Sequence, residues 1–217
     1  MSRAVDHRER RREICATSIG LFAKFGYEDV NFGMIAKACG LSRTLVYTYF
    51  KDKRAIFNQA IFEVTDAVDE KYKALSRSGR TAAAKLREMC TAVFALLFDN
   101  REFLCVIVDH LCSFRRKGKL PVDNILRHTL GLKRIVHSMV VEARHRGEYS
   151  AALDANHATE LVYSQFEAAI LRLAVSGKPV ISDLIEQTNA LLTAFRADPP
   201  GACPQLTCER KKGILQK

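Results

Sequence analysis

The sequence predicts an all-α protein, with an N-terminal three-helix domain of the helix-turn-helix type followed by a larger helical domain. Apolar residues recur every three to four positions through most of the chain, as they do on one face of a helix. Glycine, proline and capping residues divide this pattern into segments of helix length. No segment alternates apolar and polar residues for long enough to predict a strand, and the best exception, Val106-Ile-Val108, lies within a helical pattern.

The first expected helix covers residues 8–25. Residues such as Ile14 and Phe22 form its apolar face, and Gly26 ends it. The segment before residue 13 is basic and poor in apolar side chains, so we expect it to be a flexible arm.

Residues 31–54 are expected to form two short helices joined by a tight turn. Asn31 suits the N-cap of the first helix, because its side chain can accept hydrogen bonds from free backbone amides. Gly40 suits the left-handed residue that ends that helix. Ser42 suits the N-cap of the second helix, residues 43–50. This arrangement predicts a helix-turn-helix motif.

The second of these helices has two different faces. Side chains advance by about 100° per residue in a helix, so Val46 and Phe50 fall together and should pack inward. Thr44 and Thr48 then point outward, with Leu45 beside them. Small hydroxyl and methyl groups suit close contact with base edges in a DNA groove, although two solvated threonines on an ordinary surface helix would give the same pattern.

Positive charge is concentrated at the two ends of the chain. The formal net charge is +10, and residues 1–54 carry +5 of it, residues 55–198 carry +2 and residues 199–217 carry +3. A basic N-terminal domain on a nearly neutral body favours a phosphate-binding module, although excess charge can also serve solubility alone. The basic arm would follow the DNA backbone or enter a minor groove, or is only a solvated first turn of the helix.

The motif resembles the N-terminal DNA-binding signature of the TetR family of bacterial transcriptional regulators. The resemblance covers about residues 10–57 and is carried by Ile35-Ala36, Gly40-Leu41-Ser42, Val46-Tyr47 and Tyr49-Phe50-x-x-Lys53. Two positions depart from the usual pattern, since Asn31 stands where the family often has threonine and Thr44 where it often has glycine. The resemblance implies phosphate or backbone contacts from Asn31, Arg43, Tyr47, Tyr49 and Lys53, and base contacts from Thr44, Leu45 and Thr48.

We expect three parts in the chain. They are an arm with the helix-turn-helix domain at residues 1–52, a helical ligand-binding and dimerisation domain at 53–198, and a basic, poorly ordered tail at 199–217. The helices expected after the motif lie at residues 53–75, 81–98, 101–116, 122–146, 155–176 and 181–197. Cys203 and Cys208 in the tail are a lone pair, which is weak evidence for a bridge or a metal site.

A cavity between helices of the second domain is expected to hold a small, mostly apolar or aromatic effector. The candidate lining residues are Phe94, Phe98, Phe103, His110, Phe114, His137, Tyr163 and Phe166, with the two histidines as polar contacts. Aromatic residues at helical spacing also occur in ordinary cores, so core packing is the alternative.

Two amphipathic helices near the end are expected to form half of a four-helix bundle that a second subunit completes. The candidate interface residues are Leu161, Ile170, Leu184, Thr188, Leu191 and Phe195. Periodicity alone leaves open that these residues cover their own domain's core.

Enzyme signatures are absent from the sequence. The chain contains no phosphate-binding loop, dinucleotide-binding motif, nucleophile elbow or H-E-x-x-H, and its six histidines have no spacing that predicts a metal or acid–base site. We therefore expect neither an enzyme nor a cofactor. Five of the seven cysteines lie in apolar helical patterns, which predicts buried reduced thiols. No apolar stretch resembles a signal peptide or is long enough to cross a bilayer, so we expect a cytoplasmic protein.

The resemblance implies a ligand-responsive, sequence-specific regulator, most often a repressor, that binds a palindromic operator as a homodimer. The alternative is a helical small-molecule or protein-binding module without specific DNA recognition.

Overall fold

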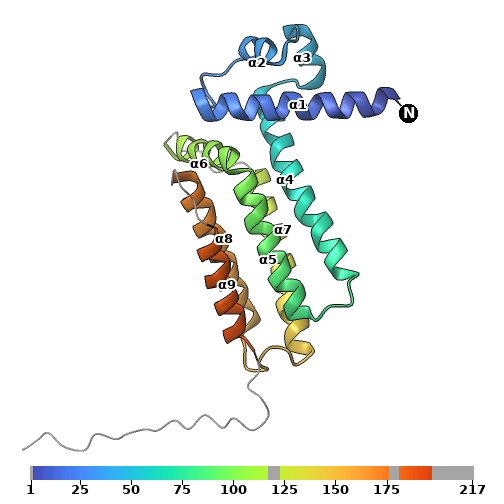
Figure 1. Ribbon diagram of the computed structural model, residues 1–217. Coiled ribbons are helices and arrows are strands. Elements are labelled where there is room, and N and C mark those ends of the chain that lie inside the picture. Colours follow the sequence, from blue (N-terminus) through green and yellow to red (C-terminus); the bar gives the residue numbers. More distant parts are fainter. Residues whose placement is uncertain (1, 117–122, 176–180, 197–217) are drawn as a thin grey trace, which may run out of the picture.

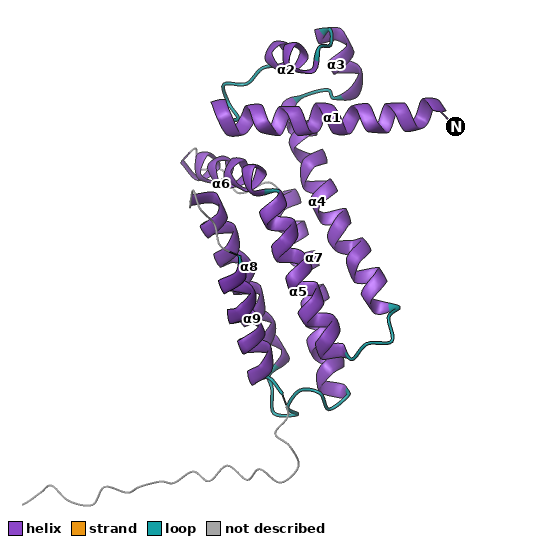
Figure 2. Ribbon diagram, in the orientation of Figure 1, coloured by secondary structure: helices purple, strands orange, loops and turns teal. Residues whose placement is uncertain are grey.

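The described part of the chain is all-α, as predicted. The computed structural model describes residues 2–116, 123–175 and 181–196, and within them the regular elements are helices only, with one isolated bridge between Tyr149 and Arg196 (Figure 2). The helices are α1 (Ser2–Phe25), α2 (Phe32–Cys39), α3 (Arg43–Tyr49), α4 (Lys53–Ser76), α5 (Ala82–Asp99), α6 (Arg101–Arg116), α7 (Asp123–His145), α8 (Ala155–Val175) and α9 (Ser182–Ala194). None of these helices is long and apolar enough to cross a membrane.

The helices form an N-terminal unit, α1–α3, set across one end of a helical body. In Figure 1, α4 leads from this unit along the body, and α8 and α9 lie on the opposite side of the body from α4. One buried cluster lies in the N-terminal unit and includes Ile14, Ile35 and Val46. It also takes Phe57 from α4 and Phe103 from α6, so these two helices join the unit to the body.

The first helix begins earlier than expected, which makes the prediction of a flexible arm wrong. Helix α1 starts at Ser2, and its basic segment is anchored through Arg11. The Arg11 guanidinium donates to the Tyr49 carbonyl oxygen at 2.6 Å and to Gln59 Oε1 at 3.2 Å, and it lies 4.4 Å from the centroid of the Phe50 ring. These contacts come from residues far along the chain, so the local apolar pattern does not reveal them.

The remaining helix boundaries agree with the sequence to within a few residues, and α6 has the predicted ends. The body has its own core around α5, with Leu86, Met89 and Phe94 completely or almost completely buried. The Glu148 carboxylate, in the turn after α7, accepts hydrogen bonds from the backbone amides of Ala82 and Ala83 and so caps the start of α5. The predicted tail with Cys203 and Cys208 lies outside the described residues.

The five described cysteines are free, but they are not equally buried. Cys15 and Cys90 are buried, Cys39 and Cys105 are half-buried, and Cys112 is exposed. The prediction of buried reduced thiols is therefore wrong for Cys112, because its position lies on the outer side of α6.

Candidate nucleic-acid interface

The turn between α2 and α3 has the hydrogen bonds that its sequence predicts. Asn31 Oδ1 accepts from the amides of Gly33 at 2.9 Å and Met34 at 3.1 Å, which caps α2. Gly40 ends α2 in the left-handed region, with φ 65° and ψ 30°. Ser42 Oγ accepts from the amide of Leu45 at 3.1 Å and caps α3. Both helices are therefore held at a defined angle by local contacts.

Helix α3 has a buried face and an exposed face, as predicted. Val46 is completely buried and Phe50, just after the helix, is 2% exposed, so both belong to the core of the N-terminal unit. Thr44, Leu45 and Thr48 are exposed. Thr48 Oγ1 donates to the Leu45 carbonyl at 2.7 Å, so its oxygen can still accept a hydrogen bond from a partner outside the helix.

Tyr47 and Arg43 lie together at the edge of this exposed face. The Tyr47 ring stacks on the Phe32 ring, with a centroid distance of 4.5 Å and an interplanar angle of 15°. The Arg43 guanidinium lies 5.8 Å from the Tyr47 ring centroid. Since the stack restricts the Tyr47 ring, its hydroxyl is presented to the surface by a pre-arranged side chain.

Lys53 is tied to the connection between α1 and α2. Its Nζ donates to the carbonyl oxygens of Tyr27 at 2.7 Å and Glu28 at 2.9 Å, and lies 4.9 Å from the Tyr27 ring centroid. An ammonium group has three donors, so one remains for a further acceptor. Lys53 therefore has a structural role, and its predicted phosphate contact stays a prediction.

Tyr49 is half-buried at the end of α3 and contacts the basic part of α1. The His7 ring lies 4.7 Å from the Tyr49 ring, and Arg11 binds the Tyr49 carbonyl oxygen. The sequence interpretation gave His7 and Arg11 no individual role and treated them only as part of the basic arm that would follow the DNA. Their spacing of four residues, which places them on one face of α1, is the signal that could have indicated a shared role.

Exposed basic side chains stand on α3 and on the segments before and after it in the chain. Lys37, Lys51 and Arg54 are exposed along with Arg43. The one acid of the segment that links α3 to α4, Asp52, accepts from the Ala55 amide at 2.7 Å and so is used as the N-cap of α4. This surface therefore combines positive charge with small polar groups on a protruding helix, which suits binding to a DNA groove and its flanking phosphates.

An aromatic cluster connects this unit to the body. The Phe57 ring of α4 lies 5.8 Å from Tyr27, 4.8 Å from His110 and 5.5 Å from Phe103, measured between ring centroids. Burial, more than the neighbouring carboxylates, raises the pKa of Tyr27 to about 12, so the phenol stays neutral at physiological pH. Helix α6, which carries Phe103 and His110, therefore packs directly against the N-terminal unit.

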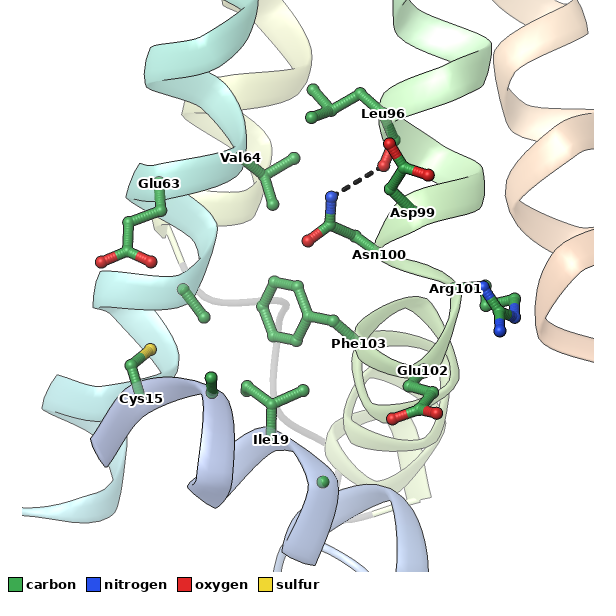
Figure 3. A pocket seen from close by; sticks show the side chains of 13 residues that line it. Cys15, Ile19, Glu63, Val64, Leu96, Asp99, Asn100, Arg101, Glu102 and Phe103 are labelled. Carbon is green, nitrogen blue, oxygen red and sulfur yellow. Dashed lines mark hydrogen bonds between the residues drawn. The ribbon is translucent and has the colours of Figure 1, made fainter. Parts of the chain in front are cut away.

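A cavity of about 220 Å³ lies between α4, α5, α6, α7 and α8. Its described lining is mostly aliphatic, with Val93, Leu96 and Ile107 among the wall residues and Gly131 on α7. A separate cleft of about 410 Å³ lies between α1, α4 and the turn from α5 to α6 (Figure 3).

The predicted lining of the cavity is largely wrong. Of the eight candidates, Phe103 and Tyr163 line it. Phe94 and Phe166 pack on each other in the core, and His110 belongs to the aromatic cluster at the domain junction. Phe98 and His137 are not among the described lining, and the side chain of Phe114 lies outside the described residues. Large aromatic side chains such as Phe94 and Phe166 fill the core of the body. The cavity lies where mostly aliphatic side chains meet.

The predicted dimer residues divide between the core and the surface. Leu184, Thr188 and Phe195 are at most 5% exposed and are buried in the subunit's own core, so a partner cannot contact them directly. Ile170 and Leu191 are partly buried against the same core. Leu161 is 50% exposed, and it shares the outer side of α8 with Leu171 and Val175, which the sequence interpretation missed.

Comparison with known proteins agrees with this geometry. Residues 14–60 match the family model described as bacterial regulatory proteins, tetR family. The chain is 22% identical to the fatty acid metabolism regulator protein of Bacillus subtilis over 85% of this chain and 93% of that protein. It is 30% identical to the HTH-type transcriptional regulator AcrR of Shigella flexneri over 49% of this chain and 51% of that one.

A solved structure shows the same fold along nearly its whole length. The transcriptional regulator FadR of Bacillus subtilis, in complex with stearoyl-CoA, aligns with a TM-score of 0.64 at 19% identity, covering 86% of this chain and 97% of that one. Residues 14–60 thus carry the DNA-binding domain of the TetR family of bacterial transcriptional regulators.

Proposed function

We propose that this regulator is a repressor that binds a palindromic operator as a homodimer and releases it when a small effector enters the body. The observation that carries the proposal is the division of α3, whose apolar side is buried while Thr44, Leu45 and Thr48 are exposed among basic residues. Residues 1–52 would form the DNA-binding domain and residues 53–198 the effector-binding and dimerisation domain.

The contacts divide into two classes. Thr44, Leu45 and Thr48 would contact base edges in the major groove. Phosphate or backbone contacts would come from Asn31, Arg43, Tyr47, Tyr49 and Lys53, and they position α3 without carrying sequence information. Two copies related by a two-fold axis would place α3 in successive major grooves.

Replacing one residue from each class tests this division. Thr48→Ala should change which bases are preferred at one or two operator positions, because a hydroxyl at a base edge is lost. Lys53→Ala should weaken binding to all sequences by a similar factor, because it removes a phosphate contact and loosens the connection held at Tyr27 and Glu28. Binding to a panel of single-base operator variants, measured by fluorescence anisotropy, separates the two effects.

Thermal melting provides the control for Lys53→Ala, since this change also removes two internal hydrogen bonds. A panel in which both variants show the same uniform loss would contradict the assignment of Thr48 to base contact. A change in base preference for Lys53→Ala would contradict the assignment of Lys53 to phosphate.

The second subunit would pack on the outer side of α8 and α9. Leu161, Ala168, Leu171 and Val175 follow helical spacing along α8, and three of them are at least half exposed. An exposed apolar stripe of this kind marks a protein interface. The proposed interface is therefore still formed by α8 and α9, but by their exposed side chains rather than by those that face the subunit's own core.

The effector would occupy the cavity between α4 and α8. Its aliphatic walls favour an apolar chain or ring. The relative named as a fatty acid metabolism regulator and the similar structure in complex with stearoyl-CoA support a ligand with an apolar chain. Phe103 lines the cavity and packs on Phe57 of the aromatic cluster, so ligand contact would shift α6 against the N-terminal unit. The effector acts only if it binds the non-DNA-binding arrangement more tightly. No catalytic step is required, and the protein would act in the cytoplasm, where its DNA is found.

Filling the cavity should uncouple effector binding from DNA binding. A Cβ built on Gly131, which lines the cavity from α7, would meet no described atom within 4 Å apart from its chain neighbours and the backbone of its own helix. Gly131→Leu should lower the affinity for the neutral fluorescent probe N-phenylnaphthylamine at least about tenfold, because the side chain occupies the apolar volume. DNA binding should be retained.

Gly131→Ala is the matched control. It should keep the probe affinity and stabilise α7 by about 1 kcal/mol, because alanine has a higher helix propensity than glycine. Equal probe binding by Gly131→Leu and the parent protein would show that the probe site lies elsewhere.

A further inference from the structure

The cavity and the cleft are neighbours that share part of their walls. Val64, Leu96 and Phe103 line both of them. The cavity holds about 220 Å³, which is smaller than the roughly 300–1,000 Å³ of typical ligand sites. A ligand of ordinary size would therefore place only its apolar part in the cavity, and its remaining part would extend past these three residues into the cleft.

The cleft has an acidic lining. Glu63, Asp99 and Glu102 line it from α4, the end of α5 and the start of α6 (Figure 3). Its one described cationic residue, Arg101, donates to the Phe98 carbonyl oxygen at 3.3 Å and lies 5.1 Å from the Phe98 ring centroid. In Figure 3 the Arg101 side chain points away from the centre of the cleft, where Phe103 and Asn100 lie.

The three carboxylates of the cleft form no ion pair within the described residues, although Glu63 also lines a neighbouring pocket with Arg8, Arg11 and Arg12. Within the described part of the chain, Asp99 and Glu102 take part in no ion pair, and Glu63 accepts a hydrogen bond from the neutral amide of Gln59 at 3.2 Å. The cavity itself has Asp69 as its one charged residue among the described lining. Burial, followed by the charge of Glu63, raises the pKa of the Cys15 thiol in the cleft to about 12, so the cleft carries no thiolate at physiological pH.

We propose that the effector is a lipophilic cation, with its apolar part in the cavity and its positively charged nitrogen in the cleft. Carboxylates attract such a group, whereas the carboxylate or phosphates of an anionic ligand would be repelled there. The inference rests on the proposed function and specifies its ligand class.

The position of the cleft also explains how the charged group acts. Cys15, Ala16, Ile19 and Gly20 of α1 form one wall, and α4 with the turn from α5 to α6 forms the others. A nitrogen bound there contacts the N-terminal unit and the body at the same time. Its binding therefore favours one orientation of α1 relative to the body, and so one spacing of the two α3 helices in the dimer.

Two probes with the same chain and opposite charge test the proposal. In calorimetric titrations of the full-length protein, decyltrimethylammonium should bind at least about fivefold more tightly than decanoate, because three acidic residues line the partly solvated cleft that would hold its nitrogen. Asp99→Asn/Glu102→Gln should reduce this preference to about twofold or less. It should leave the binding of N-phenylnaphthylamine unchanged, because that probe is neutral.

The matched control is Glu70→Gln/Asp109→Asn, which also removes two negative charges. These residues lie on α4 and α6 and line neither the cavity nor the cleft. The control variant should keep the preference for the cation. Decanoate or decanoyl-CoA binding as tightly as the cation, or an equal loss of preference in both double variants, would overturn the proposal. Operator binding without ligand is measured separately, so a failure of the cation proposal is distinguishable from a failure of the repressor proposal.

Discussion

Replacing Val46 with aspartate should abolish specific DNA binding and unfold the N-terminal unit while the helical body stays folded. Val46 is completely buried among Ile35, Phe50 and the rest of the N-terminal core. Placing an unpaired carboxylate there costs about 4 kcal/mol or more, which is a large part of the stability of a typical domain. We expect operator affinity to fall more than about a hundredfold, since α3 is no longer held in place.

Thr44→Asp provides the matched control, because it introduces the same side chain two positions away on the exposed side of α3. Its melting temperature should stay close to that of the parent protein, as surface substitutions usually change stability by no more than about 0.5 kcal/mol. Its operator affinity should still fall at least about tenfold, because the new charge meets DNA phosphates. Circular dichroism melting and anisotropy titration measure the two quantities.

Each variant has an outcome that contradicts the account. If Val46→Asp melted like the parent protein, Val46 would not belong to the core. If Thr44→Asp bound DNA as tightly as the parent protein, the exposed side of α3 would not be the side that faces DNA.

Replacing Leu171 with glutamate should separate the two subunits. Leu171 is 60% exposed on the outer side of α8, between Leu161 and Val175. In a two-fold interface the change places a carboxylate on both subunits, and each charge loses water without gaining a partner. The dimer dissociation constant should rise at least about a hundredfold. Sedimentation velocity over a range of protein concentrations measures this change.

Phe62→Glu is the control for exposure alone. Phe62 is 52% exposed, but it lies on α4, on the opposite side of the body from α8 and α9 (Figure 1). This variant should keep the oligomeric state of the parent protein. A parent protein that sediments as a monomer at every concentration would refute the homodimer, and an unchanged dimer in Leu171→Glu would place its interface elsewhere.

The sequence predicted the helix-turn-helix in detail because its determinants are local. Asn31, Gly40 and Ser42 act on backbone groups within a few residues, and the inward positions of Val46 and Phe50 follow from helical spacing. The anchoring of α1 was not predictable in this way, since Arg11 finds its partner Tyr49 only through the packing of α1 against the end of α3.

The cavity and the dimer surface required the three-dimensional structure. Phe94 and Phe166 have the same helical pattern as a residue that lines a cavity, and only their packing shows that they fill the core. A glycine inside a helix, Gly131, was the one feature of the sequence that could have indicated the cavity, because it leaves space next to α7. On α8 and α9 the more continuous apolar stripe faces the subunit's own core. The shorter outer stripe, which includes Leu171, is therefore difficult to recognise from the sequence.

Selection from a pool of random DNA duplexes tests the central claim most directly. The full-length protein without effector should enrich a palindrome whose half-sites are separated by about 34–36 Å, one helical turn, or a multiple of it. Binding to the selected duplex should weaken by a factor on the order of 1,000 between 50 and 200 mM salt, because phosphate contacts release counterions. Failure to enrich any sequence at any salt concentration would contradict specific DNA recognition by α3.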